Sequence, residues 1–174
     1  QNNDKVGLLL FSNQVELYIP PKKGKSHILR IIRELLEFSP LNKLTNINIS
    51  LEFLSGILKK KSIVFILSDF MDDKYEKTLS IMAKKHDLTG IRVFDPKDEL
   101  IPNLGLIQIN DSETGEIKWI NTQSSSVRKA YSNHYYKNVS FFESIFKKNG
   151  AGILSCRVDE SYVKKLLNFF NSRG

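Results

Sequence analysis

The sequence has 174 residues, of which 41% are hydrophobic and 26% charged, and its 26 Lys and Arg against 19 Asp and Glu give a net charge of +7. These values are typical of one globular domain over residues 1–174, and they exclude a disordered chain, a disulfide-rich mini-protein and a collagen-like repeat. No apolar run approaches the ~20 residues that span a bilayer, so we expect no membrane span in this chain. The single cysteine, Cys156, lies in an apolar run, which predicts a packing residue in a reduced, cytoplasmic protein.

The N-terminal segment predicts an antiparallel hairpin. Residues 6–11 form a continuous apolar run, residues 15–19 alternate apolar with polar side chains, and residues 12–14 have the length of a hairpin connection. We expect Pro20 and Pro21 to end the second strand, because proline cannot donate to a strand ladder.

Helices and short strands alternate along the rest of the chain. Residues 62–67 are apolar on both faces, as in a central parallel strand that helices cover on each side. The other expected elements are, in order, a helix over 26–38 capped by Ser26, a helix from Asn46 to Leu58, a helix capped by Asp72 that ends near Lys85, a strand over 88–94, a hairpin of strands 106–110 and 117–121, a helix over 125–148, a strand over 152–156 and a helix over 161–171. This alternation predicts an α/β fold with a largely parallel sheet.

Two residues are candidates for a binding site, because ligands of such sheets bind beyond the carboxyl ends of the strands. Asp69 directly follows the most hydrophobic strand, where a bound cation would offset the desolvation of its carboxylate. Thr45 supplies a hydroxyl in the loop before the second helix. Each residue has a structural alternative as a helix N-cap, although Asp72 lies nearer than Asp69 to the start of the following helix. Asp95 also ends a strand, but it precedes Pro96 and so favours a turn.

Four segments, taken in order, carry a family resemblance: residues 3–12 (NDKVGLLLFS), 15–24 (VELYIPPKKG), 63–70 (IVFILSDF) and 91–96 (IRVFDP). With the hairpin and the closing strand and helix, they resemble an uncharacterised bacterial protein family. Members of that family contain a von Willebrand factor A-like domain and are often encoded beside MoxR-type AAA+ ATPases. The resemblance covers nearly the whole chain.

The resemblance implies a fold and a metal site. The fold is a von Willebrand factor A-like, Rossmann-like three-layer sandwich, whose mostly parallel sheet has an antiparallel edge strand. Its metal-ion-dependent adhesion site holds Mg²⁺ through an Asp-x-Ser-x-Ser motif after the first strand, a threonine from a later loop and an aspartate after the fourth strand. By this resemblance Thr45 is the threonine and Asp69 the aspartate, although Leu44 stands where the family usually has glycine.

The resemblance also implies that the first, central strand and its Asp-x-Ser-x-Ser motif are absent from this chain. We therefore expect residues 1–174 alone to bind Mg²⁺ weakly or not at all. Strands 5–11 and 62–68 would then each have an unpaired edge, and unpaired buried backbone groups are costly. Three arrangements would avoid this cost: direct pairing of the two edges, a strand from another chain, or a strand from part of the protein outside this sequence. We favour a second chain, which would give a homo-oligomer, or a rearrangement.

The charge of +7 suggests nucleic-acid binding as one alternative, which requires basic residues on one face. Three lysine runs instead close predicted helices, at 59–61, 84–85 and 147–148, where cations complement the helix dipole. Only the cluster at 22–25 remains to meet phosphates, so we expect no nucleic-acid partner. The helical spacing of one aromatic series assigns it to the core: Tyr131, Tyr135, Phe142 and Phe146.

A Mg²⁺-dependent phosphotransfer enzyme is the other alternative, with Asp69, Asp72 and Asp73 as its metal cluster. Against it, the chain has no glycine-rich phosphate loop, and its spacing reveals no nucleophile and base pair. We predict a non-catalytic protein–protein interaction domain whose complete form binds an acidic side chain of a partner through Mg²⁺. The resemblance suggests a MoxR-type ATPase as that partner.

Overall fold

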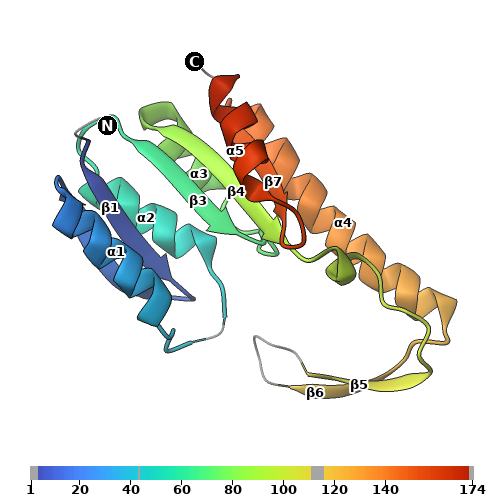
Figure 1. The fold of residues 1–174 in the computed structure, drawn as a ribbon. Coiled ribbons are helices and arrows are strands. Elements are labelled where there is room, and N and C mark those ends of the chain that lie inside the picture. The colour runs from blue at the N-terminus through green and yellow to red at the C-terminus, as the bar shows by residue number, and fades with distance from the viewer. Residues whose placement is uncertain (1–3, 43, 111–115, 173–174) are drawn as a thin grey trace.

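The computed structural model describes residues 4–42, 44–110 and 116–172 (Figure 1). The first half contains strands β1 (Val6–Phe11) and β2 (Val15–Lys22), helices α1 (Lys25–Glu37) and α2 (Ile47–Ile57), strand β3 (Ile63–Ser68) and helix α3 (Glu76–Lys85). The second half contains β4 (Asp87–Phe94), the 3₁₀ turn η1 (Pro96–Glu99), β5 (Leu106–Asn110), β6 (Ile117–Asn121), α4 (Ser125–Lys148), β7 (Gly152–Arg157) and α5 (Tyr162–Asn171). The predicted order of elements is confirmed.

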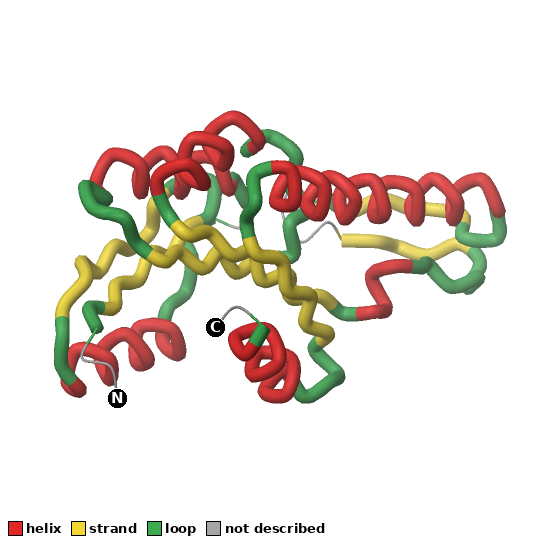
Figure 2. Tube along the Cα trace, turned by 90° about the horizontal axis from the view of Figure 1, so that it is seen from above, coloured by secondary structure: helices red, strands yellow, loops and turns green. Residues whose placement is uncertain are grey.

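Three strands form the parallel sheet, in the order β3-β4-β7. Ile63 of β3 lies opposite Asp87 of β4, and Thr89 of β4 lies opposite Gly152 of β7. Helices α2, α3 and α4 cover one side of the strands, whereas α1 and α5 lie on the other side (Figure 2). An α/β layered fold with a parallel sheet is therefore confirmed.

Strands β1 and β2 form a separate antiparallel pair, in which Val6 lies opposite Lys22 and Phe11 opposite Val15. No ladder joins β1 to β3 among the strands of the described ranges, so the two predicted open edges do not pair with each other. The prediction that Pro20 ends the second strand is wrong, since β2 continues to Lys22. Proline is tolerated there because β2 lies at the outer edge of the pair and can direct the missing donor position away from β1.

Two predicted helix caps are also wrong. Helix α1 starts after Gly24, whose φ of 107° lies outside the helical region, and Ser26 is already inside the helix. Helix α3 starts at Glu76 after Tyr75, so Asp72 does not cap it. By contrast, the Asn46 side chain accepts a hydrogen bond of 3.2 Å from the backbone N–H of Ile49 and caps α2.

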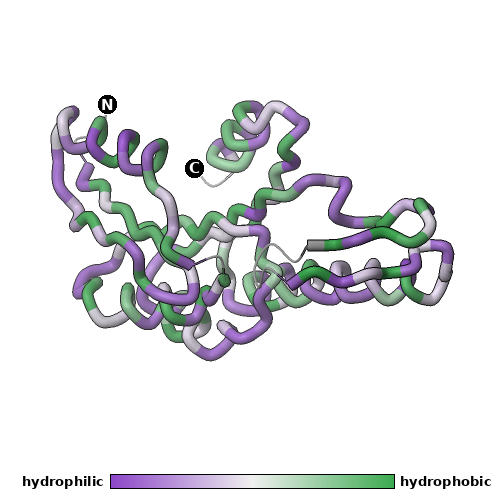
Figure 3. Tube along the Cα trace, turned by 90° about the horizontal axis from the view of Figure 1, so that it is seen from below, coloured by the Kyte–Doolittle hydropathy of each residue, from purple (hydrophilic) through white to green (hydrophobic). Residues whose placement is uncertain are grey.

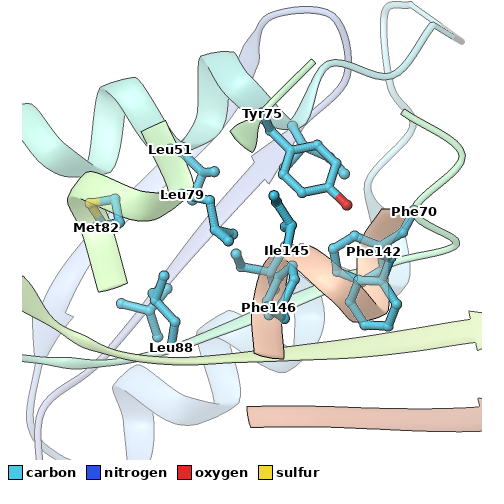
Figure 4. Close-up of a cluster of buried hydrophobic side chains, with 12 residues drawn as sticks. Leu51, Phe70, Tyr75, Leu79, Met82, Leu88, Phe142, Ile145 and Phe146 are labelled. Carbon is cyan, nitrogen blue, oxygen red and sulfur yellow. The ribbon is translucent and has the colours of Figure 1, made fainter. Parts of the chain in front are cut away.

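The hydrophobic core lies between the sheet and helices α2, α3 and α4 (Figure 4). Phe142 and Phe146 of α4 are buried in this core, and Tyr135, nearer the start of the helix, is buried outside it. The assignment of Tyr131 to the core is wrong, since this residue is exposed on the surface of α4. Cys156 is a free, buried cysteine, as predicted for a packing residue.

The sequence predicts that helices cover both faces of β3, but the face that points away from the core is exposed. Ile63 is 67% exposed and Leu67 61% exposed, although both belong to a continuous apolar run. Residues on the core side of the same strand, Val64 and Ile66, are buried. Figure 3, which views the molecule from below with α1 and α5 at the top of the picture, shows hydrophobic residues along the strands beneath these two helices.

The second antiparallel pair, β5 and β6, forms the predicted hairpin, with Leu106 opposite Asn121. The predicted turn at 111–115 lies outside the described residues. Thr122 fixes the base of the hairpin, because its hydroxyl donates to the Gly105 carbonyl at 2.7 Å and accepts from the Leu104 N–H at 2.9 Å.

Candidate functional site

The loop after β3 positions the candidate aspartate through a buried aromatic residue. Phe70 has a φ of +58°, a region that is sterically unfavourable for a bulky side chain. Its ring is fully buried and stacks on the Phe142 ring with centroids 4.1 Å apart. The packing of this ring holds the strained backbone in place, and such strain occurs often at binding sites.

Asp69 precedes Phe70 and is exposed at the carboxyl end of β3. Its Oδ1 accepts hydrogen bonds from the Ser68 hydroxyl at 3.3 Å and from the backbone N–H of Met71 at 3.2 Å. These bonds orient the carboxylate through one oxygen. Asp69 does not cap a helix, since α3 begins seven residues later, so the structural alternative for this residue is wrong.

Thr45 lies on the other side of the same pocket, which has a volume of about 230 Å³. The residues that line it come from the loop before α2 and the loop after β3: Thr45, Asn46, Asp69, Met71, Asp72, Asp73 and Lys74. Thr45 is exposed and is not the N-cap of α2, because Asn46 occupies that position. The structure therefore brings the two sequence-predicted site residues together in one pocket.

Asp72 ties these two loops together. Its Oδ2 accepts a hydrogen bond of 2.9 Å from the Ile47 N–H at the start of α2, and its Oδ1 accepts one of 2.9 Å from the Lys74 N–H. A carboxylate at the first turn of a helix also interacts favourably with the helix dipole. Asp72 thus stabilises the pocket by capping α2, a role that its position in the sequence did not reveal.

The carboxylates make the pocket locally acidic in an otherwise basic chain. The pKa of the Tyr75 hydroxyl is raised, mainly by burial and further by the charges of Asp72 and Asp73. The Tyr75 hydroxyl is buried without a hydrogen-bond partner among the described residues. A negative field of this kind favours a bound cation.

The oxygen atoms of Asp69 and Thr45 are of the kind that binds a hard cation which keeps most of its water ligands. Mg²⁺ prefers oxygen ligands and is commonly held by one or two carboxylates together with waters. Asp69 supplies a carboxylate and Thr45 a hydroxyl, both exposed in the same pocket. Within the described ranges, however, no group of three or more His, Cys, Asp and Glu side chains is arranged to hold a metal. These two residues therefore suit part of a Mg²⁺ site, not a complete protein cage.

The turn prediction for Asp95 is confirmed. Its Oδ1 accepts a hydrogen bond of 2.9 Å from the Lys97 N–H and caps the turn η1, which begins at Pro96. This carboxylate therefore serves local backbone structure, and it does not line the pocket of Thr45 and Asp69.

Comparison with known proteins identifies the family. The model of a family described as a protein of unknown function, DUF58, matches residues 1–140. The chain belongs to this family. The match covers β1 through most of α4, and so includes both loops of the pocket in this DUF58 chain.

Curated relatives of this DUF58 chain are uncharacterised mycobacterial proteins. Rv1480 of Mycobacterium tuberculosis (strain H37Rv) and Mb1516 of Mycobacterium bovis are each 20% identical to it over 173 residues, covering 98% of this chain and 54% of the relative. MAV169 of Mycobacterium avium is 25% identical over 116 residues, covering 66% of this chain and 68% of that protein. The chain thus spans about half the length of the first two.

No solved structure matches this DUF58 chain. In the part of the chain that the structure describes, every helix is too short or too polar to cross a bilayer.

Proposed function

We propose that this DUF58 domain is a non-catalytic protein-binding module whose Thr45 and Asp69 contribute to a Mg²⁺-dependent adhesion site of the von Willebrand factor A type. The observation that supports the proposal most strongly is the pocket shared by these two residues at the carboxyl end of a parallel strand. Asp69 is also the residue that follows the most hydrophobic strand, and Thr45 lies in the loop before the second helix.

The proposed site has a simple chemistry. A bound Mg²⁺ would supply an open coordination position for a carboxylate of the partner. Asp69 would orient toward the cation through the hydrogen bonds that Ser68 and Met71 donate to its Oδ1. Thr45 would add a neutral hydroxyl oxygen, which leaves the cation electron-poor enough to bind an anionic ligand.

Two features of the pocket favour binding over catalysis. The buried ring of Phe70 holds the loop after β3 in place. The hydrogen bond between Asp72 and Ile47 holds the loop before α2 against it. The carboxylates of Asp69 and Asp73 are exposed at its surface, and among the described residues the pocket lining includes no histidine or cysteine. A rigid, open, acidic site suits a cation that a second protein approaches from outside.

The proposed partner is a MoxR-type AAA+ ATPase, and the proposal concerns the complete protein. Residues 1–174 would supply only the threonine and the aspartate, so this chain alone would bind Mg²⁺ weakly. A calorimetric titration of the chain tests that point. Micromolar Mg²⁺ affinity that disappears in Asp69→Ala would contradict it.

Binding of the full-length protein to the ATPase is the direct test. Biolayer interferometry with an immobilised MoxR-type ATPase from the same organism is performed in millimolar Mg²⁺ and again in EDTA. We expect binding in Mg²⁺ that is at least tenfold weaker in EDTA, because the cation joins the two proteins. Equal binding in both buffers, or none in either, would refute the proposed function.

A phosphatase assay on a generic phosphate ester separates this proposal from an enzyme. We expect no Mg²⁺-dependent turnover above background. Turnover that is lost in Asp69→Ala would replace the binding module with a phosphotransfer enzyme.

A further inference from the structure

The hairpin of β5 and β6 lies apart from the three-stranded sheet, at the end of the molecule where α4 begins (Figures 1 and 2). Its two strands pair with each other and with no other strand of the described ranges. On one face of the hairpin, Leu106 is 65% exposed and Trp119 64% exposed. A two-stranded hairpin that buries so little apolar surface is marginally stable by itself, and additional strands would stabilise it.

The outer edge of β5 lacks the residues that normally protect an edge strand. Natural edge strands commonly carry a charged residue, above all lysine, or a proline, because an unprotected edge pairs readily with another chain. The sequence of β5, Leu-Ile-Gln-Ile-Asn, contains no charged residue, proline or glycine. By contrast, β6 carries Lys118, whose ammonium forms an ion pair with Glu116 at 2.6 Å. A further strand would therefore add beside β5.

The order of residues in β5 suits antiparallel pairing with a second copy of the same strand. In a symmetric pair centred on Gln108, this residue lies opposite Gln108 of the second copy, and Ile107 of each copy lies opposite Ile109 of the other. Ile107 and Ile109 share one face of the hairpin, where both are half-buried. Opposed β-branched side chains stabilise an antiparallel pair. Self-pairing thus matches apolar with apolar and polar with polar residues.

A second copy is a better occupant of this edge than a flexible peptide. Its β5 strand is already extended and paired with β6, so association does not have to order a disordered chain. The net charge of +7 on each copy does not oppose the contact locally, because neither β5 strand carries a charge. Two-fold symmetry uses the same edge in both copies, so both β5 edges become paired.

We propose that this chain forms a two-fold symmetric dimer through antiparallel pairing of two β5 strands, which joins the hairpins of both copies into one four-stranded sheet with the order β6-β5-β5-β6. Each copy contributes a strand of five residues, so the interface is small and the dimer dissociates on dilution. This dimer differs from the homo-oligomer expected from the sequence, which would use the edges of β1 and β3.

The dimer interface uses no residue of the Thr45 and Asp69 pocket. The dimer and the Mg²⁺-dependent binding of a partner can therefore fail independently of each other.

Charge variants at Gln108 test the dimer, because symmetry places this residue opposite itself. Sedimentation equilibrium of the 174-residue chain is measured from ~1 μM to ~1 mM, the range that resolves weak dimers. Gln108→Lys and Gln108→Glu are measured separately and as an equimolar mixture. Gln108 is exposed, so both variants should fold. If circular dichroism shows that either is unfolded, Gln108→Arg and Gln108→Asp replace the pair.

Asn133→Lys and Asn133→Glu are the matched controls. Asn133 is an exposed, uncharged polar residue on α4, so these variants change the net charge by the same amount without altering β5. Both should dimerise as wild type does.

We expect the mass of the wild type to rise with concentration from 20.0 kDa toward twice that value. Each Gln108 variant alone should dimerise at least tenfold more weakly, because like charges face each other, and the mixture should recover dimerisation because opposite charges then pair. In hydrogen exchange, β5 amides should be protected at high concentration. Three results would overturn the proposal: a monomer at every concentration, Gln108→Lys that dimerises like wild type, or protection confined to β1 and β3.

Discussion

Gly90 lies where β4 passes closest to α4. A Cβ atom at this position would lie 2.6 Å from ring atoms of both Phe142 and Phe146, closer than packed side chains tolerate. We expect Gly90→Ala to lower the free energy of unfolding by about 1–3 kcal/mol, because the two rings must leave their packed positions. Chemical denaturation measures this change.

Gly56→Ala is the control for that substitution. Gly56 lies within α2, and apart from its chain neighbours and the adjacent helix backbone no described atom lies within 4 Å of the position of an added Cβ. Alanine there should be neutral or stabilising by about 0.5–1 kcal/mol, since it favours the helix. Equal destabilisation by the two alanines would contradict close packing of β4 against α4.

His86 predicts a pH dependence of stability. The imidazole is buried, neither ring nitrogen has a hydrogen-bond partner among the described residues, and burial followed by the nearby Lys85 charge lowers its pKa. As pH falls below the ordinary pKa of about 6.5, the unfolded chain binds a proton that the folded chain does not. The free energy of unfolding should therefore decrease as pH falls from about 7 to 5.

Urea denaturation at several pH values measures this dependence. His86→Leu should flatten the decrease, because it removes the buried titrating group. His134→Gln, at an exposed position, should keep it. A slope that is the same in wild type and His86→Leu would mean that another group titrates.

For single residues, the sequence predicts where a residue lies along a strand or loop better than it predicts which distant side chains that residue contacts. Asp69 could be selected because the strand before it is evident from its apolar run. Arg92 could not be recognised as a buried residue, since its guanidinium is enclosed by the Phe94 ring at 4.0 Å and by Tyr135 of α4, which is 43 residues away. The positive φ of Phe70 likewise depends on a ring stack with distant Phe142.

Helix α2 depends on a carboxylate from outside its own segment. Asp72 accepts hydrogen bonds from the Ile47 and Lys74 N–H groups. We expect Asp72→Ala to lower the free energy of unfolding by about 0.5–2 kcal/mol, as the loss of a helix cap does. Asp73→Ala, at the exposed neighbouring carboxylate, should change it by less than about 0.5 kcal/mol.

Thermal denaturation of the two variants at one pH compares them directly. Equal midpoints for Asp72→Ala and Asp73→Ala would show that the Asp72 hydrogen bonds do not hold α2. A fall confined to Asp72→Ala would support the link between the two loops of the pocket.

The type and order of the helices and strands follow from local periodicity. The helix N-caps, and the strand faces that helices cover, do not. The spacing of apolar residues was sufficient to predict all five α-helices of the described ranges. The start of α3 was predicted three residues early, because Asp72 looks like the cap of α3, whereas its carboxylate accepts a hydrogen bond from the first residue of α2. The outer face of β3 is apolar yet exposed, and apolar character alone cannot tell which faces a helix will cover.

Over the whole molecule, five lysines lie at or near the C-terminal ends of helices. Lys84 and Lys85 lie in the last turn of α3, and Lys147 and Lys148 in the last turn of α4. The Lys59 ammonium donates to the Gly56 carbonyl at 2.9 Å, near the end of α2. These positions complement helix dipoles, and they explain how a chain of net charge +7 also presents an acidic pocket.

We propose that Asp69 binds a partner through Mg²⁺, and affinities measured for two variants in two buffers test this proposal. Full-length wild type and Asp69→Ala are each titrated against the MoxR-type ATPase in Mg²⁺ and in EDTA, with Asp73→Ala as the matched control. We expect Asp69→Ala to weaken binding at least tenfold in Mg²⁺, about 1.4 kcal/mol, and to have no effect in EDTA. An equal loss in both buffers, or no loss in Mg²⁺, would contradict the claim.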